Sequence, residues 1–249
     1  MGMHIVERPL LTLIKELLLD SQLCAQLSNP TLSNYSCGIN DETADIDYKH
    51  ILKHFCNTLL RLKCMTLDGV VLTPQLFKWH MLEQGFKGEH GINALLSPKD
   101  KQDIKLMYDL LSSITALLPT LPSDSPSEQQ LHKILCLLGG LYSHLLGAYT
   151  NVMLSLNQQL VHLSSTAHLI LAFYAKEKGG SMHSQLFFDL MKMVKNVYFC
   201  VAKIQIDNPE GSFWVILLGS DPLKTFFGKV HTIQGNDSNF NLQIGLIQP

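Results

Sequence analysis

The sequence is short of charged residues, and one long stretch has none. Asp, Glu, Lys and Arg make up 16% of the 249 residues, and none of them occurs from Ile134 to Ala175. The formal net charge of -2 argues against a broadly basic surface of the kind that binds nucleic-acid phosphates. Hydrophobic residues make up 46% of the chain, which is enough to bury a sizeable core. A globular protein is therefore expected.

The charge-free stretch also lacks a long continuous apolar run. A helix that spans a membrane needs about 20 consecutive apolar residues. Polar side chains interrupt every such run here: Ser143, His144, Asn151, Ser155, Asn157, Gln158, Gln159 and His162. We therefore predict two buried helices in this stretch and no membrane partner.

The motifs of common catalytic and cofactor sites are missing. Six cysteines, at positions 24, 37, 56, 64, 136 and 200, form no CxxC pair, so we expect free buried thiols in a reducing compartment. The Gly139-Gly140 pair is not followed by GK[ST], and no GxSxG occurs. His50 and His54 lie four residues apart, but HILKH lacks the Glu of HExxH. We predict surface histidines, no metal site and no cofactor.

The first 20 residues do not form the core of a signal peptide. Glu7, Arg8, Pro9 and Lys15 break the apolar run of this segment. We expect an intracellular protein, either cytoplasmic or nuclear.

Helical periodicity dominates the part of the chain before residue 197. Thr73-Pro74 and Ser97-Pro98 are helix starts, because a hydroxyl N-cap precedes a proline at the first helical position. Asp45 begins a helix whose apolar stripe includes Ile51 and Phe55, and whose Lys49 we expect to face solvent. The predicted helices cover residues 9–27, 45–62, 74–84, 98–118, 127–149, 152–178 and 182–196.

One Pro- and Ser-rich segment, residues 119–127, is the clearest linker. It divides the chain into a helical region over residues 1–118 and a second region over residues 128–249. The sequence leaves open whether the two regions pack as a single domain.

The character of the chain changes after residue 196. Residues 197–206 are β-branched and aromatic, residues 207–211 have turn composition, and residues 213–218 form a second apolar run. This pattern predicts a β-hairpin over residues 197–218, and Ser220-Asp221-Pro222 then begins a short helix. The predicted fold is mainly α, a multi-helix bundle-like array with a C-terminal β-hairpin followed by a short helix.

The segment from Gly219 to Gln243 reads GSDPLKTFFGKVHTIQGNDSNFNLQ. It resembles the pattern Asp-x-Leu-Glu-x-Phe-Phe, a basic residue, and Gly-Asn-Asp-x-Asn that occurs late in P-element-type transposases and their transposon-derived relatives, including fungal ones. The resemblance covers roughly residues 197–243. The matching residues are Asp221, Leu223, Phe226, Phe227, Gly235, Asn236, Asp237 and Asn239.

The resemblance implies an RNase H-like ancestor in which acidic residues hold two metal ions for DNA cleavage. Lys224 stands where the motif has Glu, and an ammonium group cannot ligate Mg²⁺. We therefore expect a vestigial motif and no enzyme activity. Packing also accounts for these residues individually, with Leu223, Phe226 and Phe227 as the buried face of a helix and Gly235-Asn236-Asp237 as a turn, but it does not account for their joint order.

Three functional hypotheses follow. The leading one is a transposon-derived, catalytically incomplete protein that acts through a protein partner or weak DNA association. The second is a helical interaction or scaffold protein without transposon ancestry. The third is a metal-dependent transposase remnant that still cleaves DNA.

Overall fold

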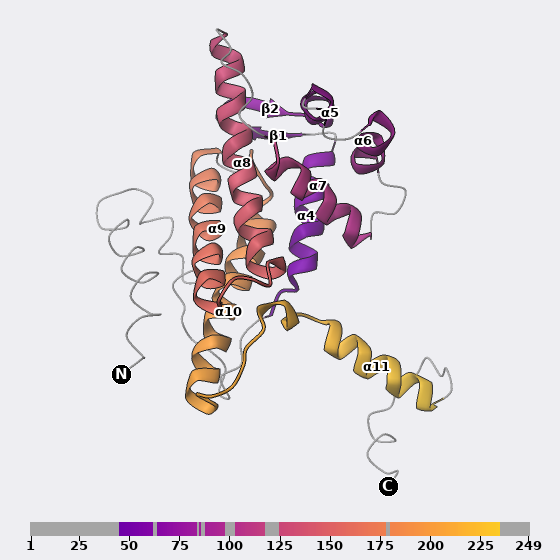
Figure 1. Ribbon diagram of the computed structural model, residues 1–249, viewed down its shortest axis with the longest axis vertical. Helices are drawn as coiled ribbons and strands as arrows, with labels where there is room; N and C mark the ends of the chain where they lie inside the picture. Colours follow the sequence, from indigo (N-terminus) through magenta and orange to yellow (C-terminus); the bar gives the residue numbers. More distant parts are fainter. Residues whose placement is uncertain are drawn as a thin grey trace, which may run out of the picture.

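The computed structural model describes residues 45–61, 64–83, 85, 88–97, 103–117, 125–177 and 180–234. Helices dominate these residues, as the sequence predicts, and Figure 1 shows them gathered around α8. The elements are α4 (Tyr48–Leu60), β1 (Met65–Leu67), β2 (Val70–Leu72), α5 (Pro74–Glu83), α6 (Glu89–Leu96), α7 (Ile104–Thr115), α8 (Pro126–Thr150), α9 (Leu156–Glu177), α10 (Ser184–Asp207), the 3₁₀ turn η1 (Val215–Leu217) and α11 (Asp221–Gln234).

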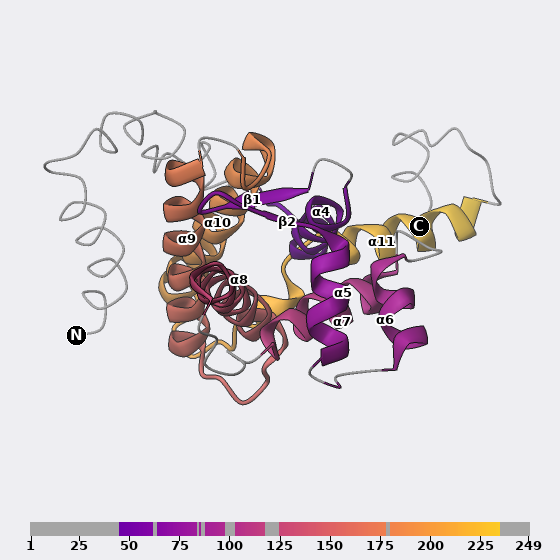
Figure 2. The ribbon, with the colours of Figure 1, turned by 90° about the horizontal axis from the view of Figure 1, so that it is seen from above.

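One hydrophobic core joins the helices on both sides of the 119–127 segment. Helix α8 packs on α7 and on α9, while α10 packs on α9 and α4. Figure 2 shows this arrangement from above, with α8 nearly end-on. Phe55 of α4 and Tyr142 of α8 meet edge to face at the centre, with ring centroids 5.4 Å apart. The described residues of the two predicted regions thus bury their apolar faces against each other.

Local capping explains where several helices begin. The Thr73 hydroxyl accepts from the Leu76 N–H at 3.1 Å, and Pro74 follows it, as the sequence predicts. Helix α7 begins later than predicted, because Asp103 caps it by accepting from the Leu106 N–H at 3.1 Å. Residues 98–102 lie outside the described part of the chain, as does the helix predicted over residues 9–27.

The β-hairpin predicted over residues 197–218 is wrong. Helix α10 continues to Asp207, and the second apolar run forms η1 instead of a strand. Val197 and Val201 lie four residues apart, so both face the core of the bundle from one side of the helix, each 1% exposed. Their burial outweighs the preference of β-branched residues for strands.

The hairpin that does form lies earlier in the chain. Strands β1 and β2 are antiparallel, with Met65 paired to Leu72 and Leu67 to Val70. Asp68 and Gly69 join them with φ angles of 52° and 75°, the two positive values that a type I′ turn requires. Helix α6 was also missed, because the glycines at 85, 88 and 91 indicate a loop.

Helix α8 is long and apolar enough, by length and composition, to cross a membrane. Half of its most apolar window is buried inside the protein, where α7 and α9 cover it. A single helix of this kind is weak evidence for a membrane span, because core helices of globular proteins share these properties.

Helix α11 differs from the others because it projects away from the bundle (Figures 1 and 2). Its described side chains, from Asp221 and from Lys224 to Lys229, are all exposed. Among the described residues, the ion pairs of α11 lie at its first turn, at Asp221 and Lys224.

Two adjacent glycines of α8 differ in how closely α7 approaches them. A Cβ at Gly139 would lie 3.1 Å from the Ile114 carbonyl oxygen, whereas a Cβ at Gly140 would meet nothing within 4 Å. We expect Gly139→Ala to lower the free energy of unfolding by about 1–3 kcal/mol, because backbone cannot yield easily. Gly140→Ala should raise it by up to about 1 kcal/mol through helix propensity. Urea denaturation of both variants measures the difference, and equal effects would contradict the close contact.

Candidate functional site

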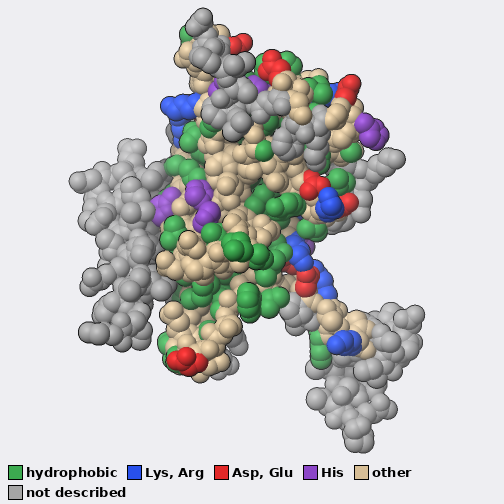
Figure 3. Space-filling view, in the orientation of Figure 1, with side chains coloured by type: hydrophobic (Ala, Val, Ile, Leu, Met, Phe, Trp, Pro, Cys, Tyr) green, Lys and Arg blue, Asp and Glu red, His purple; other side chains and the backbone are tan. Residues whose placement is uncertain are grey.

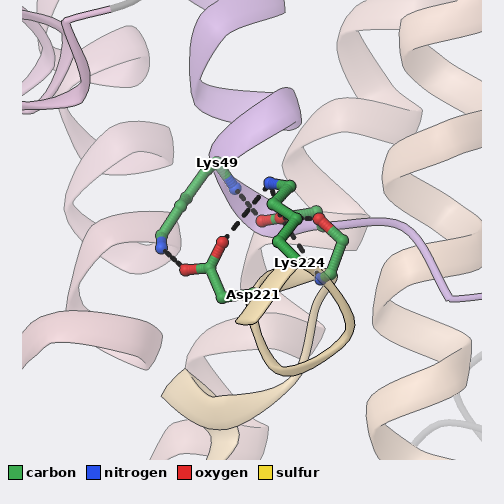
Figure 4. Close-up of polar contacts among 5 residues, drawn as sticks. Lys49, Asp221 and Lys224 are labelled. Atoms are coloured by element: carbon green, nitrogen blue, oxygen red, sulfur yellow. Dashed lines mark hydrogen bonds and ion pairs between the residues drawn. The ribbon is translucent and has the colours of Figure 1, made fainter. Parts of the chain in front are cut away.

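Two motif residues meet the start of α4 at the base of α11. Figure 4 shows this group, which we call the junction: Asp47, Lys49, Ser220, Asp221 and Lys224. Asp47 and Lys49 come from the first turn of α4, and the other three come from the start of α11. The junction thus joins residues that lie more than 170 positions apart in the sequence.

Asp47 is the buried centre of the junction. Its side chain, 5% exposed, accepts from the Lys49 N–H at 3.0 Å and so caps α4. It also accepts from the Ser220 hydroxyl at 2.8 Å and from the Ser220 N–H at 3.4 Å. Burial alone raises the pKa of Asp47, but the hydrogen bonds from Lys49 and Ser220, with the charge of Lys224, bring it below its usual value.

Gly219 allows this approach for two reasons. Its φ of +126° lies in a region that L side chains rarely adopt. A Cβ at this position would also lie 3.1 Å from Cγ of Asp47. The glycine before the motif therefore lets the backbone of Ser220 reach the carboxylate.

Asp221 lies on the exposed side of the junction. It forms an ion pair with Lys49, and Nζ of Lys224 lies 3.3 Å from its other oxygen. The hydrogen bond from Lys49, followed by that from Lys224, lowers the pKa of Asp221, and the same bond raises the pKa of Lys49. Solvent screens this pair, so it orients α11 more than it stabilises the fold.

Lys224 lies between two carboxylates. Its Nζ is 3.8 Å from Asp47 and 3.3 Å from Asp221. The ammonium group thus takes the position that a cation would need in order to bridge the two acids. Within the described ranges, no group of three or more His, Cys, Asp or Glu residues gathers to hold a metal ion. Hydrogen bonding and charge neutralisation are the chemistry available at the junction.

Of the other motif residues, only Phe226 and Phe227 have side chains that the structure describes, and they do not join the junction. Phe226 and Phe227 are 57% and 44% exposed, so the predicted buried face of this helix is wrong for both. The helix projects from the bundle, so these rings are not part of its buried core. The side chain of Leu223 and residues Gly235, Asn236, Asp237 and Asn239 lie outside what the structure describes.

Sequence reasoning missed the α4 half of the junction. The N-cap of α4 is Asp47, directly before Tyr48, whereas the sequence pattern predicts a start two residues earlier, at Asp45. Lys49, predicted to face solvent, instead pairs with Asp221. Nothing in the local sequence indicates that either residue meets α11.

A groove of about 440 Å³ between α4, α6 and α7 is a second candidate. Its lining includes Cys56, Leu60, Leu95 and Met107. Burial raises the pKa of the Cys56 thiol to about 12, so the thiol stays protonated and is a poor nucleophile. The lining also includes Asn57, Arg61, Ser97 and Asp103, so polar side chains stand at the groove beside the apolar ones.

Asp47 should make stability depend on pH. Its folded-state pKa lies below the unfolded value of about 3.9, so its contribution is present above that value and is lost as the pH falls through the folded pKa. We expect Asp47→Ala to lower the free energy of unfolding at pH 7 by about 1–3 kcal/mol.

Asp47→Asn is the matched control, because Asn can still cap α4 but carries no charge to pair with Lys224. It should lose less than the alanine variant at pH 7. Urea denaturation between about pH 7 and pH 2 should show the wild type converging on the asparagine variant in acid, because a protonated Asp47 is neutral but can still cap α4. A constant difference over this range would exclude the proposed role of the carboxylate.

No protein-family model, no curated protein and no solved structure matches this chain. The transposase resemblance of the C-terminal segment therefore stays a prediction based on its residues.

Proposed function

We propose that this protein is a non-catalytic scaffold that acts through helix pairing, with α11 as the binding arm and a second copy of the chain as its partner. The observation that carries the proposal is the exposure of Phe226 and Phe227, 57% and 44%, on a projecting helix. Large aromatic side chains left exposed together are typical of interaction sites.

The sequence of α11 supports pairing with another helix. In the sequence, Leu223, Phe226, Phe227 and Val230 are spaced i, i+3, i+4 and i+7, the pattern of an apolar stripe on a helix. Lys224, Thr225, Gly228 and Lys229 supply the polar remainder. A stripe of this width is typical of a helix that packs against one partner helix.

The position of the two phenylalanines favours a second copy. They lie at the middle of α11, which runs from Asp221 to Gln234. If a twofold axis passed through this point, α11 of one copy would run antiparallel to α11 of the other over its whole length. All four phenylalanine rings would then lie at the centre of the pair. Twofold self-association is the commonest form of oligomer.

The junction supports the same role because it holds the arm in one direction. Asp47 ties Gly219-Ser220 to α4, and Lys49 ties the first residue of α11. A binding element that is already oriented loses less conformational entropy on association. Trp214 and Leu217, which precede α11 in the sequence, are also exposed, at 63% and 66%.

The non-catalytic part of the proposal rests on Lys224. An ammonium group that already neutralises Asp47 and Asp221 competes with any divalent cation for these acids. Transposon descent would explain the motif, and a scaffold role is compatible with descent or with independent origin. Weak DNA association also stays a prediction, which a DNA-binding assay would test.

Self-association is tested by sedimentation equilibrium. We expect the wild type to form a dimer, and the double change Phe226→Ser and Phe227→Ser to weaken dimerisation by at least about 100-fold, because central aromatic residues dominate interfaces. Met153→Ser is the matched control, since it removes another apolar side chain, 87% exposed, far from α11 in sequence. A wild type that stays monomeric, or a dimer that survives the double change, would refute the proposed pairing.

Catalysis is tested separately with supercoiled plasmid DNA. We expect no nicking in Mg²⁺ or Mn²⁺ by the wild type, because Lys224 occupies the space between the carboxylates. Nicking by the wild type that Asp221→Ala abolishes would show an active nuclease. That result would overturn the non-catalytic claim whatever the outcome of the sedimentation experiment.

A further inference from the structure

Two histidines from neighbouring helices face each other away from the junction. His144 of α8 and His162 of α9 have their Nδ1 atoms 3.1 Å apart, and their ring centroids are 4.9 Å apart. Both side chains are partly buried. In Figure 3, histidine side chains gather on the α9 side of the bundle, where few charged side chains are seen.

We propose that His144 and His162 form a binding site for a divalent transition-metal ion held by their two Nδ1 atoms. Imidazole nitrogens bind such ions at about 2.0–2.1 Å. An ion at that distance from both atoms would subtend an angle of roughly 98° and place the ring centroids about 4.8 Å apart. The observed 4.9 Å fits this arrangement. The 3.1 Å contact is also the length of a hydrogen bond between the two rings, so an ion would take the place of the proton between the Nδ1 atoms.

The backbone of α8 holds the pair at this distance. A Cβ at Gly147 would lie 3.3 Å from Nδ1 and 3.4 Å from Cε1 of His162, so the glycine makes room for the ring beside α8. Helices α8 and α9 are joined by residues 151–155 and pack along each other. The spacing of the two rings therefore depends on helix packing and not only on side-chain rotamers.

The chemistry of the pair selects the kind of ion. Neutral imidazole suits Zn²⁺, Cu²⁺ and Ni²⁺, whereas Mg²⁺ and Ca²⁺ prefer oxygen ligands. No Lys or Arg occurs from Ile134 to Ala175, so the sequence around both ligands carries no ammonium group to repel a cation. Solvent would complete the coordination, which makes the site open and weaker than a four-ligand structural site.

His50 and His54 provide an internal comparison. They lie four residues apart on α4, and both are exposed. They can approach one ion only from a single helix, and no short contact between their rings holds them together in the described structure. If both pairs bound metal, a titration of the wild type alone would not separate them, so the experiment needs variants of each.

The test is calorimetric titration of the full chain with Zn²⁺ and with Cu²⁺, after removal of metal by a chelator. We expect the wild type to bind one equivalent at this site. His144→Ala and His162→Ala should each weaken that binding at least about tenfold, whereas the double change His50→Ala and His54→Ala should leave it unchanged. Gly147→Ala should also weaken binding, because it displaces the His162 ring.

Thermal unfolding gives a second measurement that does not depend on heats of binding. A metal that binds only the folded state raises Tm, so Zn²⁺ should stabilise the wild type and the α4 variant but neither His144→Ala nor His162→Ala. The proposal is overturned if the wild type binds no metal, if binding survives loss of either proposed ligand, or if removing His50 and His54 abolishes it.

Discussion

The carboxylate of Asp47 is the interaction on which the position of α11 depends. As the N-cap of α4 it uses one oxygen to accept from the Lys49 N–H, and its second oxygen accepts from Ser220. A buried carboxylate is costly unless its hydrogen bonds are satisfied, so these partners must be present together. The first described helix is therefore fixed to the start of the last one. The glycine at 219 completes this arrangement, because its φ of +126° disfavours other residues and a Cβ there would crowd the carboxylate.

At the junction, a lysine neutralises acidic residues that a metal ion would otherwise have to neutralise. In a two-metal site, carboxylates stay close to one another because bound cations neutralise them. Here the chain supplies the positive charge itself, with Lys224 near Asp47 and Asp221, and Lys49 paired to Asp221. Such a group needs no metal to remain together. The same residue therefore accounts for a stable base of α11 and for the lack of a cation requirement in the proposed scaffold.

Most helices could be predicted from the sequence because their signals are local. Thr73-Pro74 marks a helix start that the structure confirms, whereas Pro126, assigned to the linker, is the first residue of α8. The hairpin expected after residue 196 was wrong because β-branched composition was weighed above the helical spacing of Val197 and Val201. The Asp68-Gly69 turn had a usable signal that was overlooked.

The candidate site was only half predictable. The resemblance drew attention to Asp221 and Lys224, but their partner Asp47 lies 173 positions from Ser220 and is brought there by tertiary packing alone. The exposure of Phe226 and Phe227 was hidden for a related reason. An apolar stripe indicates which face of a helix is suited to packing. It does not indicate whether that face packs inside this chain or against another molecule.

Helix α8 contacts α7 and α9 closely at two glycines, and through Tyr149 it contacts Tyr48 next to the junction. Gly139 and Gly147 lie eight residues apart, so they face directions about 80° apart around the helix. One admits the backbone of α7, and the other admits His162 of α9. Tyr149, two residues after Gly147, stacks on Tyr48 at 4.4 Å, and Tyr48 is the neighbour of Asp47. Each glycine costs about 1 kcal/mol of helix propensity, which close packing on both sides must offset. The close approach at Gly147 makes the position of His162 depend on the packing of α8 against α9, and the Tyr149 ring packs beside the residue next to Asp47.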